Sequence, residues 1–207
     1  MRLRITFAKQ GPLRYTGHLD LHRIWERTLR RAGLPLAYSH GFHPQPRIQI
    51  ASALPLGFTS RAEIVDIFLT ESVPLEGLRE KIQSVAPPGL EILKIEEIEA
   101  NAPALQTQLR AAEYAVTLPN QAGDSHSELP RRIAAVLEAP ALPRQRRGKD
   151  YDLRPLIEEL RLLEDGRLFM RLSAREGATG RPEEVLAELG IPWEETHIER
   201  LRLIFEE

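Results

Sequence analysis

The stretch HLDLHRIWERTLRRAGLP, residues 18–35, decides the fold, because it places a helix between segments that alternate as strands do. Its apolar residues Leu21, Trp25 and Leu29 recur at the spacing of one helix face. The closing glycine and proline stand in the order that usually ends a helix. The sequence therefore predicts a helix over residues 18–32.

The segments on either side of this helix predict one sheet. Before the helix, apolar and polar residues alternate over residues 2–7. After it, the pattern predicts two strands, a helix whose first residue is proline, and a further strand, at Ile48–Ile50, Glu63–Thr70, Pro74–Ala86 and Leu90–Ile98. The order in the first half of the chain is β-α-β-β-α-β.

The same order recurs in the second half of the chain. The pattern predicts, in sequence, a strand, a helix, two strands joined by the turn Glu164-Asp165-Gly166, a helix and a strand, at Tyr114–Leu118, Ser125–Ala139, Glu158–Leu163, Arg167–Ser173, Arg181–Gly190 and His197–Phe205. We therefore expect an α+β protein made of two tandem ferredoxin-like (βαββαβ) domains with antiparallel sheets. The expected boundaries are an N-terminal domain at 1–100, a linker at 101–111 and a C-terminal domain at 112–207.

Composition excludes several classes of chemistry. The chain has 207 residues, a net charge of −2 and no cysteine. Disulfides, thiolate metal sites, iron–sulfur ligation and cysteine nucleophiles are therefore excluded. Because we find neither a signal peptide nor an apolar stretch of about 18 residues, we expect a cytoplasmic protein without membrane contact.

Charge is distributed unevenly along the chain. Residues 1–50 hold nine basic and two acidic residues, whereas residues 51–100 hold four basic and nine acidic ones. This separation indicates a side of the protein that faces a polyanion. The alternative is a set of solvated helix faces whose charge is balanced elsewhere.

Four arginines of the first predicted helix share one face. At about 100° per residue, Arg23, Arg27, Arg30 and Arg31 lie opposite the apolar face. A guanidinium group can donate to two phosphate oxygens at once, so this face suits phosphate. An acidic protein, or solvent alone, would also satisfy it.

The segment SHGFHPQPR, residues 39–47, combines two stiffening prolines with aromatic rings. Pro44 and Pro46 hold the residues before them extended, so Phe42 and His43 are available to stack on bases while Arg47 meets a phosphate. The alternative is a rigid connection with Phe42 in the core. A second basic run, RQRRGKD, is either a phosphate-gripping loop or a solvated connection. The predicted nucleic-acid contacts are Arg14, Arg23, Arg27, Arg30, Arg31, Phe42, His43, Arg47, Arg144, Arg146, Arg147 and Lys149.

Four histidines, His18, His22, His40 and His43, are catalytic candidates. Imidazole can act as the acid or base of a metal-independent ribonuclease, with nearby arginines stabilising the phosphorane-like charge. A histidine-only zinc site is physically possible, but no carboxylate stands at a familiar ligand spacing. We therefore expect no metal and no cofactor.

Arg14–Gly57, followed by AEIVDI, resembles the radical-SAM-linked uncharacterised bacterial proteins. The later segments KDYDLRPLIEEL and HIERLRLIF are similar to the same family. That family's domain occurs as a separate chain or fused to a radical SAM protein, so the resemblance implies a radical SAM partner. The family usually reads Ser-Gln-Gly-Phe-Asn-Pro-His-Pro-Lys where this chain has SHGFHPQPR. The histidine between the prolines is Gln45 here, which argues against a shared catalytic base at this position.

The tandem ferredoxin-like arrangement is also similar to the RNA-processing proteins of the RAMP superfamily, by topology alone. Taken together, these observations favour an RNA-binding or substrate-presenting accessory protein that acts with a separate radical SAM enzyme in RNA modification or processing, and that has no activity of its own. One alternative is a metal-independent endoribonuclease that uses histidine. Another is a protein-interaction module without nucleic acid.

Overall fold

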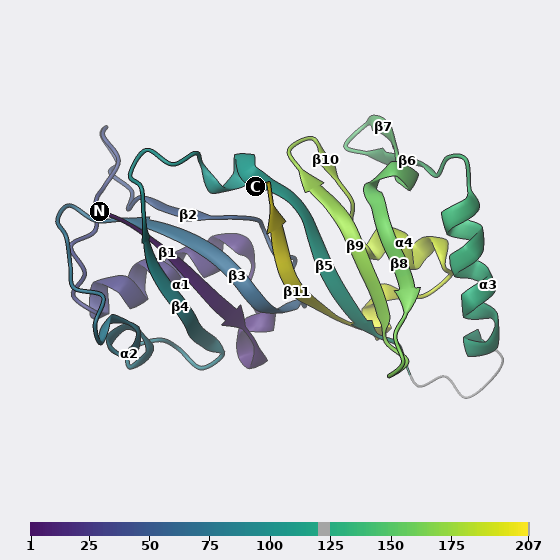
Figure 1. Ribbon diagram of the computed structural model, residues 1–207, viewed down its shortest axis with the longest axis horizontal. Coiled ribbons are helices and arrows are strands. Elements are labelled where there is room, and N and C mark those ends of the chain that lie inside the picture. Colours follow the sequence, from purple (N-terminus) through teal and green to yellow (C-terminus); the bar gives the residue numbers. More distant parts are fainter. Residues whose placement is uncertain (120–124, 207) are drawn as a thin grey trace. The chain divides into compact units, whose positions relative to one another are not determined.

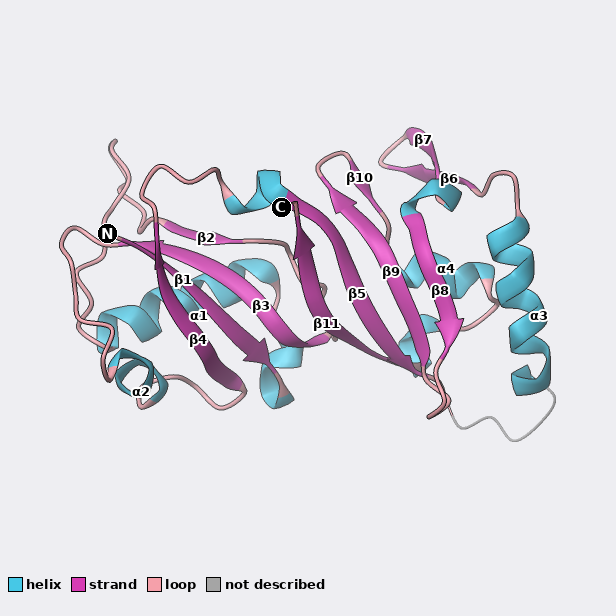
Figure 2. Ribbon diagram, in the orientation of Figure 1, coloured by secondary structure: helices cyan, strands magenta, loops and turns pink. Residues whose placement is uncertain are grey.

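The structure is a computed structural model that describes residues 1–119 and 125–206, without the side chains of 125–127. The remaining residues of the predicted C-terminal domain, 120–124 and 207, lie outside this description. The chain divides into two compact units, unit 1 (Met1–Leu109) and unit 2 (Arg110–Glu207). Each unit combines strands of a mostly antiparallel sheet with two α-helices (Figures 1 and 2). The predicted α+β class is therefore confirmed.

Unit 1 has the strand order β4-β1-β3-β2, and each neighbouring pair is antiparallel. Its elements are β1 (Arg2–Lys9), the 3-10 helix η1 (Gly11–Tyr15), α1 (His18–Arg31), β2 (Ile48–Ile50), β3 (Thr59–Phe68), α2 (Leu78–Gln83), β4 (Leu90–Ile98) and the 3-10 helix η2 (Leu105–Gln108). Helix α2 begins later than predicted, at Leu78 and not at Pro74. Gly77 has a left-handed φ of 68°, which interrupts helical geometry before that point.

The core of unit 1 lies between its sheet and its helices. Leu3, Ile5 and Phe7 alternate on one face of β1 and are fully buried. They pack in one cluster with side chains of α1 and α2, so both helices cover the same face of the sheet (Figure 2). The rings of Phe7 and Trp25 meet edge to face, with centroids 4.8 Å apart. Burying a side chain of this size contributes about 1.5–3 kcal/mol, so this row anchors α1 on the sheet.

Unit 2 has the strand order β11-β5-β9-β8, with β10 pairing the end of β9. Its elements are β5 (Leu109–Thr117), α3 (Ser125–Glu138), β6 (Pro143–Arg146), β7 (Lys149–Asp152), the 3-10 helix η3 (Arg154–Leu156), β8 (Ile157–Leu162), β9 (Leu168–Arg175), β10 (Ala178–Thr179), α4 (Pro182–Glu188), the 3-10 helix η4 (Trp193–Glu195) and β11 (His197–Phe205). The hairpin β6–β7, a separate two-stranded sheet, and the short β10 were not predicted. None of the helices that the structure describes is long and apolar enough to cross a membrane.

Most of the segment predicted as a linker, residues 101–109, belongs to unit 1, whereas residues 110–111 lie in β5 of unit 2. Leu105 is fully buried, and the Gln106 side chain donates to the carbonyl of Ile50 at 2.8 Å. Arg2 also donates to the carbonyl of Pro103 at 3.0 Å. These bonds hold the chain against unit 1 up to the boundary at Leu109.

The sheet of unit 1 holds a carboxylate between two arginines. Asp66 is fully buried and accepts hydrogen bonds from Arg2 at 2.6 Å and from Arg4 at 2.9 Å. Its hydrogen bond to Arg4 raises the pKa of that guanidinium. Buried charges need such partners, so Asp66 and the two arginines neutralise one another within the sheet.

Glu113 has a similar place in unit 2. It pairs across the strands with Arg171 at 2.7 Å and also accepts from Arg202. Hydrogen bonds from Arg202, and then from Arg171, lower the pKa of Glu113 although burial opposes them. The carboxylate is thus held in its ionised form within the sheet.

Candidate nucleic-acid interface

Helix α1 presents the predicted arginine face to solvent. Leu21, Trp25 and Leu29 are buried at four-residue spacing, which fixes the opposite side of the helix as its exposed side. Four arginines lie on that exposed side, and all four are exposed: Arg23, Arg27, Arg30 and Arg31.

Only weak ion pairs neutralise this face. Arg23 lies 3.5 Å from Asp20, and Arg30 lies 3.3 Å from Glu26. Exposed pairs within one helix contribute only about 0.3–0.5 kcal/mol each. Within the described part of the chain, Arg27 and Arg31 form no ion pair. The face therefore keeps most of its positive charge available to a ligand.

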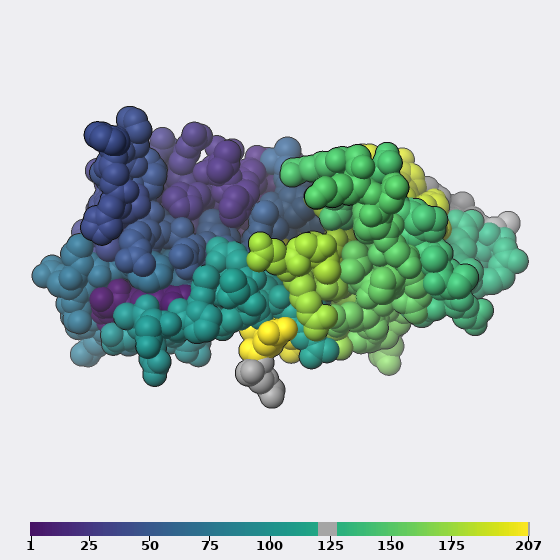
Figure 3. All heavy atoms as spheres, turned by 90° about the horizontal axis from the view of Figure 1, so that it is seen from above, coloured from purple at the N-terminus to yellow at the C-terminus, as the bar shows by residue number. Residues whose placement is uncertain are grey.

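The segment with the two prolines forms a projecting hairpin, residues 38–46, which stands out from unit 1 (Figures 1 and 3). At its base, the amide of Arg47 donates to the carbonyl of Ala37 at 2.8 Å. One rung higher, the amide of Ser39 donates to the carbonyl of Gln45 at 2.8 Å, and the Ser39 hydroxyl accepts from the Gln45 amide at 3.0 Å. These bonds hold the two arms of the projecting hairpin together.

The tip of the projecting hairpin, residues 40–44, is exposed at every position. The Phe42 ring is fully exposed, with a relative accessibility of 102%, so it is not in the core. His40 and His43 lie on either side of it in sequence and are exposed too. Exposing the apolar surface of an aromatic ring to water is unfavourable. The exposed ring is available for stacking on a base.

Arg47 and Arg14 lie at different places around this surface. Arg47, at the base of the projecting hairpin, stacks over the ring of Phe68 at 4.0 Å and stays exposed. Arg14 is half-buried and donates to the carbonyl of Gly57 at 3.2 Å. The Arg14 side chain therefore supports a loop, whereas Arg47 presents its charge beside the projecting hairpin.

The four candidate histidines come from two elements. His18 begins α1, and His22 has its Nε2 3.3 Å from the carbonyl of Ile48. His40 and His43 lie at the hairpin tip. Among the described residues, no three His, Cys, Asp or Glu side chains are grouped so that they could hold a metal. The ribonuclease mechanism with histidine as acid or base stays a prediction.

The second basic run forms the hairpin β6–β7 in unit 2. Its turn, Arg147-Gly148, has positive φ at both residues, 51° and 76°, which is the geometry of tight two-residue hairpin turns. Arg146 binds both oxygens of Glu184, at 2.7 and 2.8 Å, and donates to the Tyr151 hydroxyl at 3.0 Å.

The guanidinium group of Arg146 is charged, but Glu184 and Tyr151 already accept its hydrogen bonds. Burial alone would lower the pKa of Arg146, yet the hydrogen bonds to Glu184 raise it overall. Arg144 similarly pairs with Glu188 of α4. Only Arg147 and Lys149, at the turn, are exposed members of this predicted cluster.

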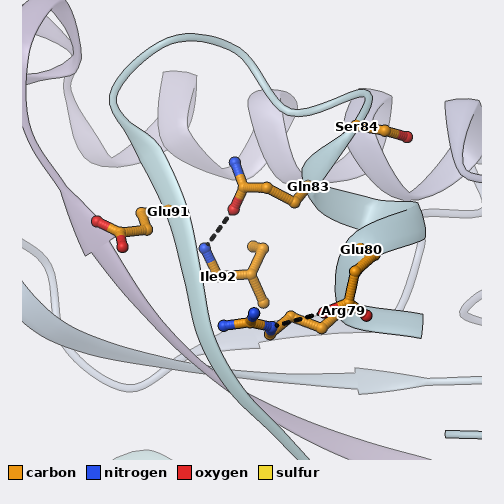
Figure 4. Close-up of a pocket in the computed structure, with 6 residues that line it drawn as sticks. All are labelled: Arg79, Glu80, Gln83, Ser84, Glu91 and Ile92. Carbon is orange, nitrogen blue, oxygen red and sulfur yellow. Dashed lines mark hydrogen bonds and ion pairs between the residues drawn. The ribbon is translucent and has the colours of Figure 1, made fainter. Parts of the chain in front are cut away.

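One further hollow, of about 520 Å³, lies beside α2 and β4 and contains none of the predicted residues (Figure 4). Gln83 accepts from the amide of Ile92 at 2.7 Å and donates to the carbonyl of Leu90 at 2.9 Å. Arg79 is turned to its neighbour Glu80 at 3.1 Å. These polar groups are bonded to the backbone of β4 or to a neighbouring side chain. The hollow therefore does not hold a set of reactive groups that point toward one another.

Sequence reasoning missed several residues that matter in the structure. Asp66 and Glu113 hold arginines within the sheets, and Glu184 and Glu188 neutralise the second basic run. No local pattern marks these pairs, because their members are far apart along the chain.

These features define an α+β protein of two sheet units, the first of which carries an exposed basic and aromatic surface. The chain belongs to the family described as "Uncharacterized protein conserved in bacteria (DUF2344)", whose model matches residues 2–182. The match therefore includes α1, the projecting hairpin and the β6–β7 hairpin. A comparison with curated proteins gives no match.

Proposed function

We propose that this chain is an RNA-binding accessory protein that grips single-stranded RNA with the projecting hairpin and the C-terminal half of α1. The observation that carries the proposal is the fully exposed ring of Phe42 at the tip of a hydrogen-bonded hairpin. Aromatic rings bind single strands because every base offers a flat face, and one such stack contributes about 1–3 kcal/mol.

The phosphate contacts come from arginines on the same part of unit 1. Five residues, 32–36, separate the end of α1 from the base of the projecting hairpin. Arg27 and Arg31 lie on the exposed face before this connection, and Arg47 lies after it. A strand that stacks one base on Phe42 and runs toward the C-terminal end of α1 would bring its phosphates to these guanidinium groups.

We further infer that each unit is a ferredoxin-like domain. In unit 1 the first, second, third and fourth strands of the βαββαβ order are β1, β2, β3 and β4, and they lie in the order 4-1-3-2. In unit 2, β5, β8, β9 and β11 have the same order. This order supports the predicted tandem arrangement and the topological similarity to RAMP-superfamily proteins.

The radical SAM enzyme enters this proposal through the sequence resemblance of Arg14–Gly57. This chain has no cysteine, so its residues supply no thiolate to an iron–sulfur cluster. The proposed division of labour is that this chain presents RNA while a separate protein carries the radical chemistry.

The test is RNA binding measured by fluorescence anisotropy over a range of salt concentrations. We expect the logarithm of the affinity to fall linearly with the logarithm of salt, and Arg27→Gln/Arg31→Gln to reduce the slope by about 0.7 for each phosphate that the variant no longer neutralises. Phe42→Ala should weaken binding about 5- to 150-fold at an unchanged slope. The matched control is Arg131→Gln/Arg175→Gln in unit 2, two exposed arginines outside the predicted contacts, which should leave the affinity unchanged. The proposal fails if the wild-type protein shows no salt-sensitive binding.

Analysis of the RNA after incubation with the protein addresses the endoribonuclease alternative. His40 and His43 flank Phe42 at the hairpin tip, so an RNA stacked there would lie near both imidazoles. Cleavage that persists in EDTA, leaves a cyclic phosphate and is lost in His40→Ala or His43→Ala would favour this alternative. Intact RNA after prolonged incubation with the protein would rule it out.

A further inference from the structure

Unit 1 carries a second exposed surface at the N-terminal end of α1. Tyr15, Leu19 and Leu56 are 70%, 72% and 59% exposed, and with Phe42 they are the four most exposed large hydrophobic side chains of the described residues. A single exposed leucine is ordinary on a protein surface. Because three large apolar side chains stand on adjoining segments, we take them together as one patch, and exposed apolar patches mark interaction sites.

Hydrogen bonds bring the segments of this apolar patch together. The amide of Gly57 donates to the carbonyl of Arg14 at 2.7 Å, and the Arg14 side chain donates back to the carbonyl of Gly57 at 3.2 Å. Leu56 and Tyr15 are the chain neighbours of these two bonded residues. Leu19 follows Tyr15 by four residues, in the first turn of α1.

The base of the apolar patch is fixed. Leu13 is buried below it, and the Thr16 hydroxyl donates to the carbonyl of Leu13 at 2.6 Å. The carbonyl of Thr16 in turn accepts from Lys9, which is fully buried, at 2.9 Å. Gly57 has a φ of 88°, which glycine adopts without strain. The exposed side chains therefore stand on an ordered base, and little backbone conformational entropy is lost when a partner covers them.

Charge around the apolar patch selects the partner. Leu19, Arg23 and Arg27 follow one another at four-residue spacing, so the apolar end of this row continues into a basic one. A helix lying along α1 would need aliphatic residues over Leu19 and carboxylates over Arg23. A second copy of this chain would bring one arginine face against another, which like charge disfavours.

We propose that the Tyr15–Leu19–Leu56 patch docks an acidic amphipathic helix of a partner protein. The partner's aliphatic row covers the patch, and its carboxylates meet Arg23. This surface is distinct from the proposed RNA contact, which uses the other end of α1 and the projecting hairpin. One protein would therefore hold RNA and a protein partner at opposite ends of one helix.

The test uses the full chain and synthetic helix-forming peptides of about three turns, which can cover Leu19 and Arg23 without reaching Arg31. The first peptide has a leucine row flanked by glutamates, the second has lysines in place of the glutamates, and the third has the composition of the first in scrambled order. We expect only the first peptide to bind, and Leu19→Ser to weaken it at least about tenfold. Arg23→Gln should reduce the salt dependence of binding, and Phe42→Ala should leave it unchanged.

A second measurement separates this proposal from the RNA proposal and from other occupants. Leu19→Ser should keep wild-type RNA binding and a wild-type far-ultraviolet circular dichroism spectrum, so loss of peptide binding cannot be assigned to unfolding. Equal binding of the acidic and basic peptides, or no binding of the first peptide, would overturn the proposal. So would self-association in sedimentation, or binding to phosphatidylcholine vesicles, if Leu19→Ser abolishes it.

Discussion

The two arginine clusters of this chain look alike in sequence and differ in structure. On α1, the carboxylates nearest to Arg23 and Arg30 come from the same helix, and these pairs are exposed. On the β6–β7 hairpin, the partners of Arg146 and Arg144 come from α4, 38 and 44 residues away, and each pair is about three-quarters buried. The difference teaches that the density of positive charge in a segment does not tell whether that charge is free. Whether the positive charge is free depends on the carboxylates that the fold places beside the segment.

Asp66 in the sheet of unit 1 provides a third case, in which the paired arginine, Arg2, is buried and only stabilises the fold. Asp66→Asn should lower the free energy of unfolding by about 3–5 kcal/mol, because Arg2, which is 2% exposed, would keep a buried charge without its counter-ion. Urea unfolding followed by circular dichroism measures this loss. Arg27→Gln on α1 is the matched control and should change stability by less than about 0.5 kcal/mol. A loss below about 1 kcal/mol in Asp66→Asn would remove the distinction between structural and available arginines.

A smaller effect is expected at the β6–β7 hairpin. Arg146→Gln should lower the free energy of unfolding by about 1–3 kcal/mol, because Glu184 and Tyr151 lose a charge-assisted partner. RNA affinity should stay at the wild-type value. The comparison would be wrong if this variant lost RNA affinity while its stability was unchanged, since Arg146 would then be a ligand-binding residue like those proposed on α1.

The smallest effect is a pH dependence in unit 2. Hydrogen bonds from Arg202 and Arg171 lower the pKa of Glu113, so its stabilisation is complete above the unfolded-state pKa of about 4.3 and is lost as the pH falls through the lower folded-state value. Glu113→Gln should lower the free energy of unfolding at pH 7 by about 1 kcal/mol, a figure discounted because Arg202 is largely exposed. The difference in the free energy of unfolding between Glu113→Gln and the wild type should decrease below about pH 4.3, as measured by unfolding curves. A difference that is constant down to pH 2 would show that the ion pair is not its source.

Periodicity was sufficient for the elements whose burial is regular. The helix predicted over residues 18–32 is α1, His18–Arg31, because its apolar residues really form one buried face. The β6–β7 hairpin escaped prediction because its strands are four residues long and polar, so no apolar alternation marks them. The one sequence signal for this hairpin was Gly148, since glycine readily adopts the positive φ that its turn requires.

The candidate site was only partly visible in the sequence, for a physical reason. The exposed side of α1 follows from the helix wheel, so Arg23, Arg27, Arg30 and Arg31 were found. Leu19 lies off the apolar face of the same wheel, and this signal for an exposed apolar residue was available. The bond between Arg14 and Gly57 that brings Leu56 beside Tyr15 joins segments 43 residues apart, and no local pattern reports it.

The hydrogen bonds of Gln83 have a consequence for how this protein behaves at high concentration. Strand β4 is an outer strand of unit 1, and its free backbone groups are a template on which a second chain could add a strand and start an aggregate. The Gln83 side chain accepts a hydrogen bond from the backbone amide of Ile92 and donates one to the carbonyl of Leu90. The charged residues Lys94 and Glu96 follow along the same strand. A single side chain from α2 thus shields one end of the sheet from edge-to-edge polymerisation, and charge protects the rest.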